Sequence, residues 1–187
     1  MLNYNSVIKN EMKQESISVK EISPVIKINL RGKKREFLTN VGKNLNMILP
    51  TESNTSTTSD KLTAIWLSPD EWMIVSNELA SKDTNKSDLH EMLFNSISKT
   101  NLGAVVDVTD QFVQVELKGE SIYEIFSAGS PFNFNEFKEK KGSTTQTVLN
   151  HVDVILHHKD ENILNLFVRR SFAEHLFSWI EDCASRL

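Results

Sequence analysis

Short stretches of alternating or consecutive hydrophobic residues, separated by turn residues, predict β-strands in this chain. The segment Ser68-Pro69-Asp70-Glu71 joins two of them with residues typical of a type I turn, so we expect a hairpin there. From Val113 to Leu117 apolar and polar residues alternate, which predicts a strand with one face in water. The expected strands are residues 24–30, 62–67, 72–75, 103–108, 113–117, 144–149, 152–157 and 163–168.

Two helices are predicted between these strands from hydrophobic residues three and four positions apart. The first covers Asp88 to Lys99 and has acidic residues at its start, where they interact favourably with the helix dipole. The second lies between Gly119 and Gly129. We expect its inward side to be formed by Ile122, Ile125 and Phe126.

A third helix is predicted to begin near Phe172, where Ser171 and Glu174 have the spacing of a capping box. Its apolar residues fall on one stripe, made of Phe172, Leu176, Trp179, Ile180, Cys183 and Leu187. We interpret this stripe as a surface that packs on a sheet. An aromatic stripe could instead hold a planar cofactor, but no glycine-rich phosphate loop accompanies it.

The order of elements is strands, helix, strands, helix, strands, helix, which predicts an α+β fold with helices packed against largely antiparallel sheets. This order is compatible with an assembly of two similar halves. Residues 1–16 are polar and without periodicity, so we expect a flexible N-terminal arm followed by a single domain over residues 17–187. Residues 51–61, rich in Ser, Thr and Asn, are expected to form a flexible loop.

Charge and composition narrow the classes of function. The net charge is −4, which argues against a nucleic-acid binder, because binding to polyanions depends on clustered Lys and Arg. One cysteine excludes an internal disulfide and any multi-cysteine metal site. We see neither a signal peptide nor an apolar run of membrane-spanning length, and we therefore expect a cytoplasmic protein without membrane contact.

The chain carries no recognisable catalytic or metal-binding motif. Its five histidines do not form the helical pair that binds zinc, and His157 and His158 should point to opposite faces of one strand. Nucleotide-binding glycine loops and serine-nucleophile elbows are missing from the sequence. Cys183 lies on the apolar stripe, where burial raises a thiol pKa, so a thiol nucleophile assisted by His175 is not expected.

Two charged clusters have alternative interpretations. Residues 31–35 contain four basic residues, which we interpret as solvated surface, or alternatively as a dock for an acidic partner or a polyanionic ligand tail. Asp70 and Glu71 could be proposed as a catalytic acid pair. Adjacent carboxylates in an exposed turn lack the burial that would raise either pKa, so we do not expect this role.

The most specific motifs of the chain are the Pro-Asp-Glu-Trp hairpin at residues 69–72 and the Arg-Ser-Phe-Ala segment at residues 170–173. Together with several other segments, in order, they resemble the gamma subunit of bacterial heterotetrameric sarcosine oxidase. Others are Ile28-Asn29-Leu30-Arg31-Gly32, Leu49-Pro50, Asn54-Thr55, Val106-Asp107-Val108-Thr109-Asp110, Gly119, Gly129-Ser130-Pro131, Phe137, Gly142, Thr147 and Trp179. The resemblance covers nearly all of residues 17–187. The chain departs from the family pattern at Ser68, at Asn133 and in the polar stretch 138–141.

This resemblance implies a fold similar to the folate-binding domain of the glycine-cleavage aminomethyltransferase. It also implies a small non-catalytic subunit of an oxidase that demethylates sarcosine to glycine, forms hydrogen peroxide, and passes the one-carbon unit to tetrahydrofolate or releases it as formaldehyde. The expected partners are the alpha, beta and delta subunits, chiefly the large alpha subunit. FAD, FMN, NAD and tetrahydrofolate are expected on those subunits, with no cofactor bound by this chain.

Two alternatives remain open. The chain could be a folate-binding module, for which Asp107 and Asp110 are the only candidate carboxylates for the pterin ring. Asp107 could equally cap a turn or end a strand, which is the interpretation we favour. The chain could also serve as a gamma-like subunit of another amine-oxidising complex.

Overall fold

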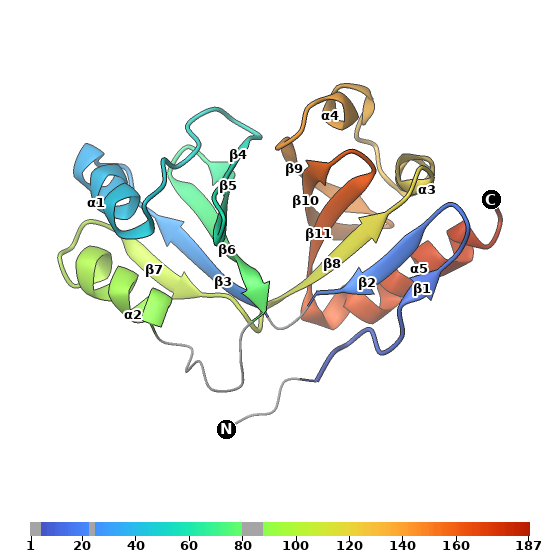
Figure 1. The fold of residues 1–187 in the computed structure, drawn as a ribbon, viewed down its shortest axis with the longest axis horizontal. Helices are drawn as coiled ribbons and strands as arrows, with labels where there is room; N and C mark the ends of the chain where they lie inside the picture. Colours follow the sequence, from blue (N-terminus) through green and yellow to red (C-terminus); the bar gives the residue numbers. More distant parts are fainter. Residues whose placement is uncertain (1–4, 23–24, 80–87) are drawn as a thin grey trace. The chain divides into compact units, whose positions relative to one another are not determined.

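The computed structural model describes residues 5–22, 25–79 and 88–187. The chain forms two compact units. Unit 1 combines Met1–Pro24 with Asp110–Leu187, and unit 2 is the continuous segment Val25–Thr109. Each unit has one antiparallel sheet and its own helices (Figure 1), which confirms the α+β class with largely antiparallel sheets.

Unit 2 is built on a five-stranded antiparallel sheet with the order β4-β5-β6-β3-β7. The predicted hairpin is confirmed, because β5 and β6 pair directly and place Trp66 opposite Trp72. The predicted loop at residues 51–61 contains a short strand, β4, which pairs with β5 at the sheet edge. The strands are β3 (Val25–Arg31), β4 (Ser56–Thr58), β5 (Leu62–Ser68), β6 (Glu71–Leu79) and β7 (Ala104–Asp107).

Three helical segments belong to unit 2: α1 (Arg35–Leu45), α2 (Asp88–Leu93) and the π-helix η1 (Phe94–Ser98). The helix predicted from Asp88 to Lys99 is present, although its second half is a π-helix. Helix α1 was not predicted. Its buried residues are Phe37, Val41 and Leu45, a narrow stripe one helical turn apart, and the polar residues and Gly42 between them weakened the sequence signal.

Unit 1 contains a six-stranded antiparallel sheet with the order β1-β2-β8-β11-β10-β9. Part of the expected flexible arm is packed on this unit. Met12 lies in β1, which pairs with β2, and both Ile8 and Met12 are buried in the core. The strands are β1 (Met12–Lys13), β2 (Ser18–Glu21), β8 (Phe112–Lys118), β9 (Thr144–Leu149), β10 (Val152–Asp160) and β11 (Ile163–Arg169).

The helices of unit 1 are α3 (Ile122–Gly129), α4 (Asn135–Glu139), the 3₁₀ turn η2 (Arg170–Phe172) and α5 (Ala173–Ala184). In α3, Ile122, Ile125 and Phe126 are buried, as predicted. Helix α5 packs on the core of the unit (Figure 1) through Leu176 and Ile180. None of the helices in the described ranges is long and apolar enough to cross a membrane.

The start and the buried stripe of α5 differ from the prediction. The helix is entered through η2, and no side chain caps its N-terminus, so the predicted capping box of Ser171 and Glu174 is not formed. The 3₁₀ turn carries Phe172 outward, where it is 48% exposed. The core positions are Ala173, Leu176, Ile180 and Ala184, whereas Trp179 and Cys183 are only partly buried and Leu187 is exposed.

Candidate functional site

The candidate carboxylate Asp107 closes a turn at the end of β7. Its Oδ1 accepts a hydrogen bond of 2.9 Å from the backbone N–H of Thr109, the pattern of an Asx turn. The Thr109 hydroxyl in turn accepts a 3.0 Å hydrogen bond from the backbone N–H of Lys27. This arrangement uses the carboxylate of Asp107 to shape the chain, which is the role we favoured for it.

The side chain of Lys27 is buried beside this turn, with 1% of its surface exposed. Its Nζ donates hydrogen bonds to the carbonyl oxygens of Val25, at 2.9 Å, and of Thr109, at 3.3 Å. Backbone carbonyls thus solvate part of an ammonium group that has left water. The second candidate carboxylate, Asp110, is exposed and belongs to unit 1, whereas Asp107 belongs to unit 2.

The two carboxylates of the β5–β6 turn are held by neighbouring groups. Ser68 Oγ donates a 2.8 Å hydrogen bond to Asp70 Oδ1, and this bond, with help from the charges of Lys33 and Arg31, lowers the pKa of Asp70 despite slight desolvation. Glu71 accepts a hydrogen bond of 2.7 Å from Asn29 Nδ2. A lowered pKa is the opposite of what a general acid requires.

The adjacent histidines on β10 point to opposite faces of the sheet, as predicted. His158 lies in an aromatic cluster with Tyr123 and Phe137, at ring-centroid distances of 6.3 and 6.0 Å, and its Nδ1 donates to the carbonyl of Lys140 at 3.0 Å. His157 is buried on the other face, where burial lowers its pKa to about 4. Among the described residues, no three His, Cys, Asp or Glu side chains cluster as a metal site would require.

Two further ionisable side chains of unit 1 have pKa values above their ordinary range. Burial raises the pKa of Tyr123 to about 12. Burial, together with the charge of Asp182, raises the pKa of the Cys183 thiol. A thiol nucleophile needs a lowered pKa, whereas Cys183 has a raised one and packs, partly buried, against the core of unit 1.

A row of polar side chains crosses one face of the unit 1 sheet, and the sequence did not predict it. Strand pairing places Thr144 opposite His157, His157 opposite Asn165, and Asn165 opposite Glu116. Asn165 is buried, and its Oδ1 has no hydrogen-bond partner among the described residues. The row could be recognised only from the register of four strands, which the sequence does not provide.

Gln114, beside this row, and Glu116, at its end, show the chemical character of the row. Gln114, two residues before Glu116 on β8, is also buried with an unpartnered Oε1 among the described residues. Glu116 accepts hydrogen bonds from Lys118, at 2.7 Å, and Lys159, at 3.0 Å; burial opposes ionisation, but these lysines outweigh it and lower the pKa of Glu116. With His157 neutral, the row offers hydrogen-bond acceptors rather than a group that exchanges protons near neutral pH.

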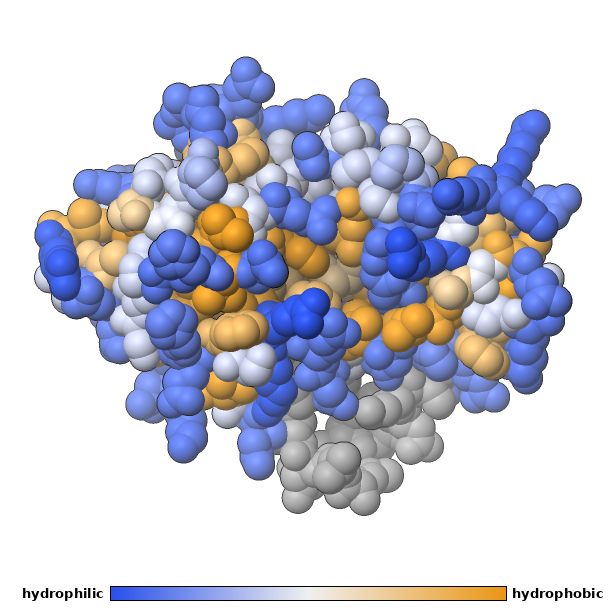
Figure 2. Space-filling view, turned by 180° about the vertical axis from the view of Figure 1, so that it is seen from behind, coloured by the Kyte–Doolittle hydropathy of each residue, from blue (hydrophilic) through white to orange (hydrophobic). Residues whose placement is uncertain are grey.

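Large hydrophobic side chains also reach the surface. Figure 2 shows one face of the molecule on which apolar residues lie between hydrophilic ones. The exposed large hydrophobic residues in the described ranges include Ile48, Met92, Phe94, Val106, Phe172 and Leu187. Single exposed apolar side chains are normal in folded proteins, so these positions alone do not mark a site.

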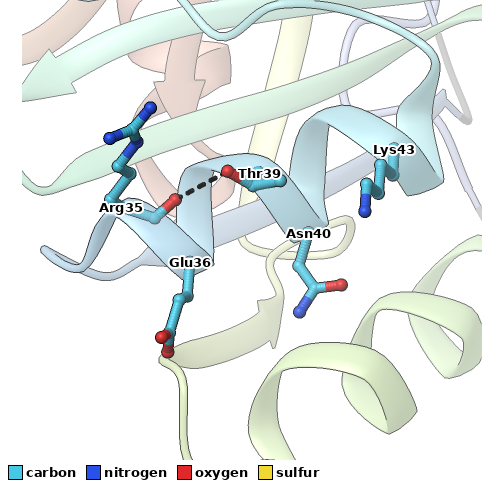
Figure 3. A pocket seen from close by; sticks show the side chains of 5 residues that line it. All are labelled: Arg35, Glu36, Thr39, Asn40 and Lys43. Carbon is cyan, nitrogen blue, oxygen red and sulfur yellow. Dashed lines mark hydrogen bonds between the residues drawn. The ribbon is translucent and has the colours of Figure 1, made fainter.

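Helix α1 presents a polar surface on unit 2. Arg35, Glu36, Thr39, Asn40 and Lys43 line a wide, open depression of about 380 Å³ (Figure 3). The Thr39 hydroxyl bonds back to the carbonyl of Arg35 at 3.0 Å, so it contributes little to the recognition of a ligand. All five residues come from one helix, and the surface is suited to contact with another macromolecule more than to enclosing a small molecule.

Comparisons with known proteins agree on fold and family. Residues 32–186 match the family described as "Sarcosine oxidase, gamma subunit family". A structure of heterotetrameric sarcosine oxidase from Corynebacterium sp. U-96, in complex with pyrrole 2-carboxylate, contains a similar chain. The TM-score is 0.81 at 19% identity, and the alignment covers 94% of this chain and 88% of that one. No individually curated protein matches the sequence.

A second similar structure is the glycine cleavage system aminomethyltransferase T from Bartonella henselae. Its TM-score is 0.62 at 15% identity, and the alignment covers 88% of this chain but only 45% of the aminomethyltransferase. The predicted likeness to the aminomethyltransferase fold is therefore confirmed. This chain corresponds to less than half of that protein.

Proposed function

The chain belongs to the sarcosine oxidase gamma subunit family, and from this premise we propose that it is a non-catalytic subunit that assembles and stabilises a heterotetrameric sarcosine oxidase. The observation that carries the proposal is the extent of the family match, which runs from the first helix of unit 2 to the last helix of unit 1. The complex would oxidatively demethylate sarcosine to glycine. FAD, FMN, NAD and tetrahydrofolate would be bound by the other subunits.

The shifted pKa values of three ionisable groups in unit 1 are consistent with a non-catalytic role. A general acid or base at neutral pH needs a pKa near 7. His157 has a pKa of about 4 and Tyr123 of about 12, and the Cys183 thiol is shifted upward. Each of these three groups is shifted away from the range in which it could exchange protons during turnover.

The proposed partners are the alpha, beta and delta subunits, chiefly the large alpha subunit, in the cytoplasm. Coexpression of the tagged chain with those subunits, followed by size exclusion and an oxidase assay with sarcosine, tests the proposal. We expect one complex that contains the chain, and a loss of assembled oxidase when the chain is omitted. A chain that stays monomeric and leaves oxidase yield unchanged would contradict the proposal.

A second candidate function, folate binding by this chain, is favoured by the aminomethyltransferase-like fold and by the unpartnered amide oxygens of Gln114 and Asn165. Folate ring N–H groups could donate to such oxygens. The engagement of Asp107 in a turn weighs against it. Calorimetry with tetrahydrofolate on the purified chain separates the two candidates, because an assembly subunit should release no heat of binding.

A further inference from the structure

The segment that contains helix α1 is positively charged, although the chain as a whole is negatively charged. The protein carries a net charge of −4, yet residues 31–43 hold five basic residues and a single carboxylate, Glu36. The five are Arg31, Lys33, Lys34, Arg35 and Lys43. A local excess of one sign on a protein of the other sign marks a surface that attracts a partner of opposite charge.

Within the described part of the chain, two of these cations lie within ion-pair distance of carboxylates. Arg31 lies 3.5 Å from Glu71, and Lys33 lies 3.5 Å from Asp70, both in the β5–β6 turn. Lys34, Arg35 and Lys43 are exposed and form no ion pair with the described residues. We call these three residues the basic surface.

The one carboxylate within this segment does not cancel the basic surface. In Figure 3, Arg35 and Glu36 extend from opposite sides of the helix start, and Lys43 lies toward the other end of the helix. Glu36 forms no ion pair with the described residues either. The cations toward both ends of the helix therefore remain available to an anionic group.

The isolated chain gains no helix stability from the cations at the start of α1. The N-cap residue is Lys34, no side chain caps the helix, and Arg35 occupies the first helical position. Ser, Thr, Asp or Asn would be favoured at the cap, and positive charge at an N-terminus opposes the helix dipole. Residues that violate such local preferences are expected at functional or strained sites.

We propose that the basic surface of α1 docks onto an acidic surface of another subunit of the oxidase complex. This inference rests on the proposed function, because it assumes a partner protein. A protein partner fits better than nucleic acid, since the basic surface holds three cations on a chain whose net charge is −4. Ile48, which is 82% exposed two residues after the helix C-cap Asn46, adds an apolar contact of the kind found in protein interfaces.

The test uses the chain coexpressed with the other sarcosine oxidase subunits and a charge-reversal variant, Arg35→Glu with Lys43→Glu. The matched control is Lys138→Glu with Lys140→Glu, which makes the same change in charge at two exposed lysines of unit 1. We expect the α1 variant to bind the other subunits about tenfold more weakly, and the control to stay within about twofold of wild type. A milder variant, Arg35→Gln with Lys43→Gln, should give an intermediate loss and shows that the effect is not due to misfolding.

Salt dependence gives a second readout. Between about 0.05 and 0.5 M salt, wild type should lose affinity more steeply than the α1 variant, because screening weakens only the charges that are present. Equal binding of wild type and the α1 variant would overturn the docking surface and leave the proposed function intact. A wild-type chain that fails to bind the other subunits would overturn both. Salt-sensitive binding of DNA through Arg35 and Lys43, without an effect on subunit binding, would also overturn it.

Discussion

At the scale of single residues, Gly129 has a steric role. It belongs to one of the segments that resemble the gamma subunit family. Gly129 ends α3, and a Cβ added there would lie 2.6 Å from the Cζ2 and Cη2 atoms of Trp179 in α5. Two segments that resemble the family, Gly129-Ser130-Pro131 and the C-terminal Trp, therefore meet in space. The backbone at Gly129 can approach the indole only because no side chain intervenes.

We predict that Gly129→Ala destabilises the protein by about 1–3 kcal/mol, because the methyl group must displace the Trp179 ring. Trp179→Phe removes the two ring atoms concerned, so Gly129→Ala should cost much less in that background. A double-mutant cycle measured by urea unfolding gives this coupling directly. Additive effects of the two substitutions would show that the close approach does not constrain the fold.

At the scale of elements, the buried stripe of α5 differs from the stripe expected from the sequence. Leu176 is buried and Phe172 is 48% exposed. We predict that Leu176→Ala costs about 2–5 kcal/mol, the range for large-to-small changes in a core, and that Phe172→Ala costs less than about 1 kcal/mol. Thermal or denaturant unfolding of the two variants tests this. A larger loss for Phe172→Ala would favour the stripe that begins at Phe172.

The N-terminal segment is a second element whose stability can be tested. Ile8 is buried in the core of unit 1, where it lines a small cavity with Val115, Leu166 and others, and its backbone N–H donates a 2.7 Å hydrogen bond to Glu21 Oε2. We predict that Ile8→Ala costs about 2–5 kcal/mol, while Lys9→Ala, at the exposed neighbouring position, changes stability by less than about 0.5 kcal/mol. If the backbone amides around Ile8 exchange equally fast in both variants and in wild type, this segment is a flexible arm.

The elements also show what the sequence could predict. Strands such as β5 and β6 were found because their hydrophobic runs are long and their turn carries Pro69. Helix α1 was missed because its buried stripe has one residue per turn, and β1 because two residues carry no period. The polar row through His157 and Asn165 depends on long-range strand register, which is set by tertiary packing and not by local pattern.

At the scale of the whole molecule, unit 1 contains a buried histidine that should limit stability in acid. Burial, with smaller contributions from the charges of His158 and Lys159, lowers the pKa of His157 from its ordinary value of 6.5 to about 4. The unfolded chain therefore takes up a proton at a higher pH than the folded chain. The stability that neutral His157 provides is complete above pH 6.5 and is lost as the pH falls toward 4.

We predict that wild type loses roughly 3 kcal/mol through this group between those two pH values. His157→Gln, which cannot titrate, should lose much less over the same range, whereas His151→Asn, at an exposed position, should follow wild type. Urea unfolding of the three proteins at several pH values measures the difference. Parallel acid losses in wild type and His157→Gln would mean that the folded protein already carries charge at His157. If the free energy of unfolding depends less on pH in His157→Gln alone, the burial of one neutral imidazole controls how the stability of the entire chain responds to acid.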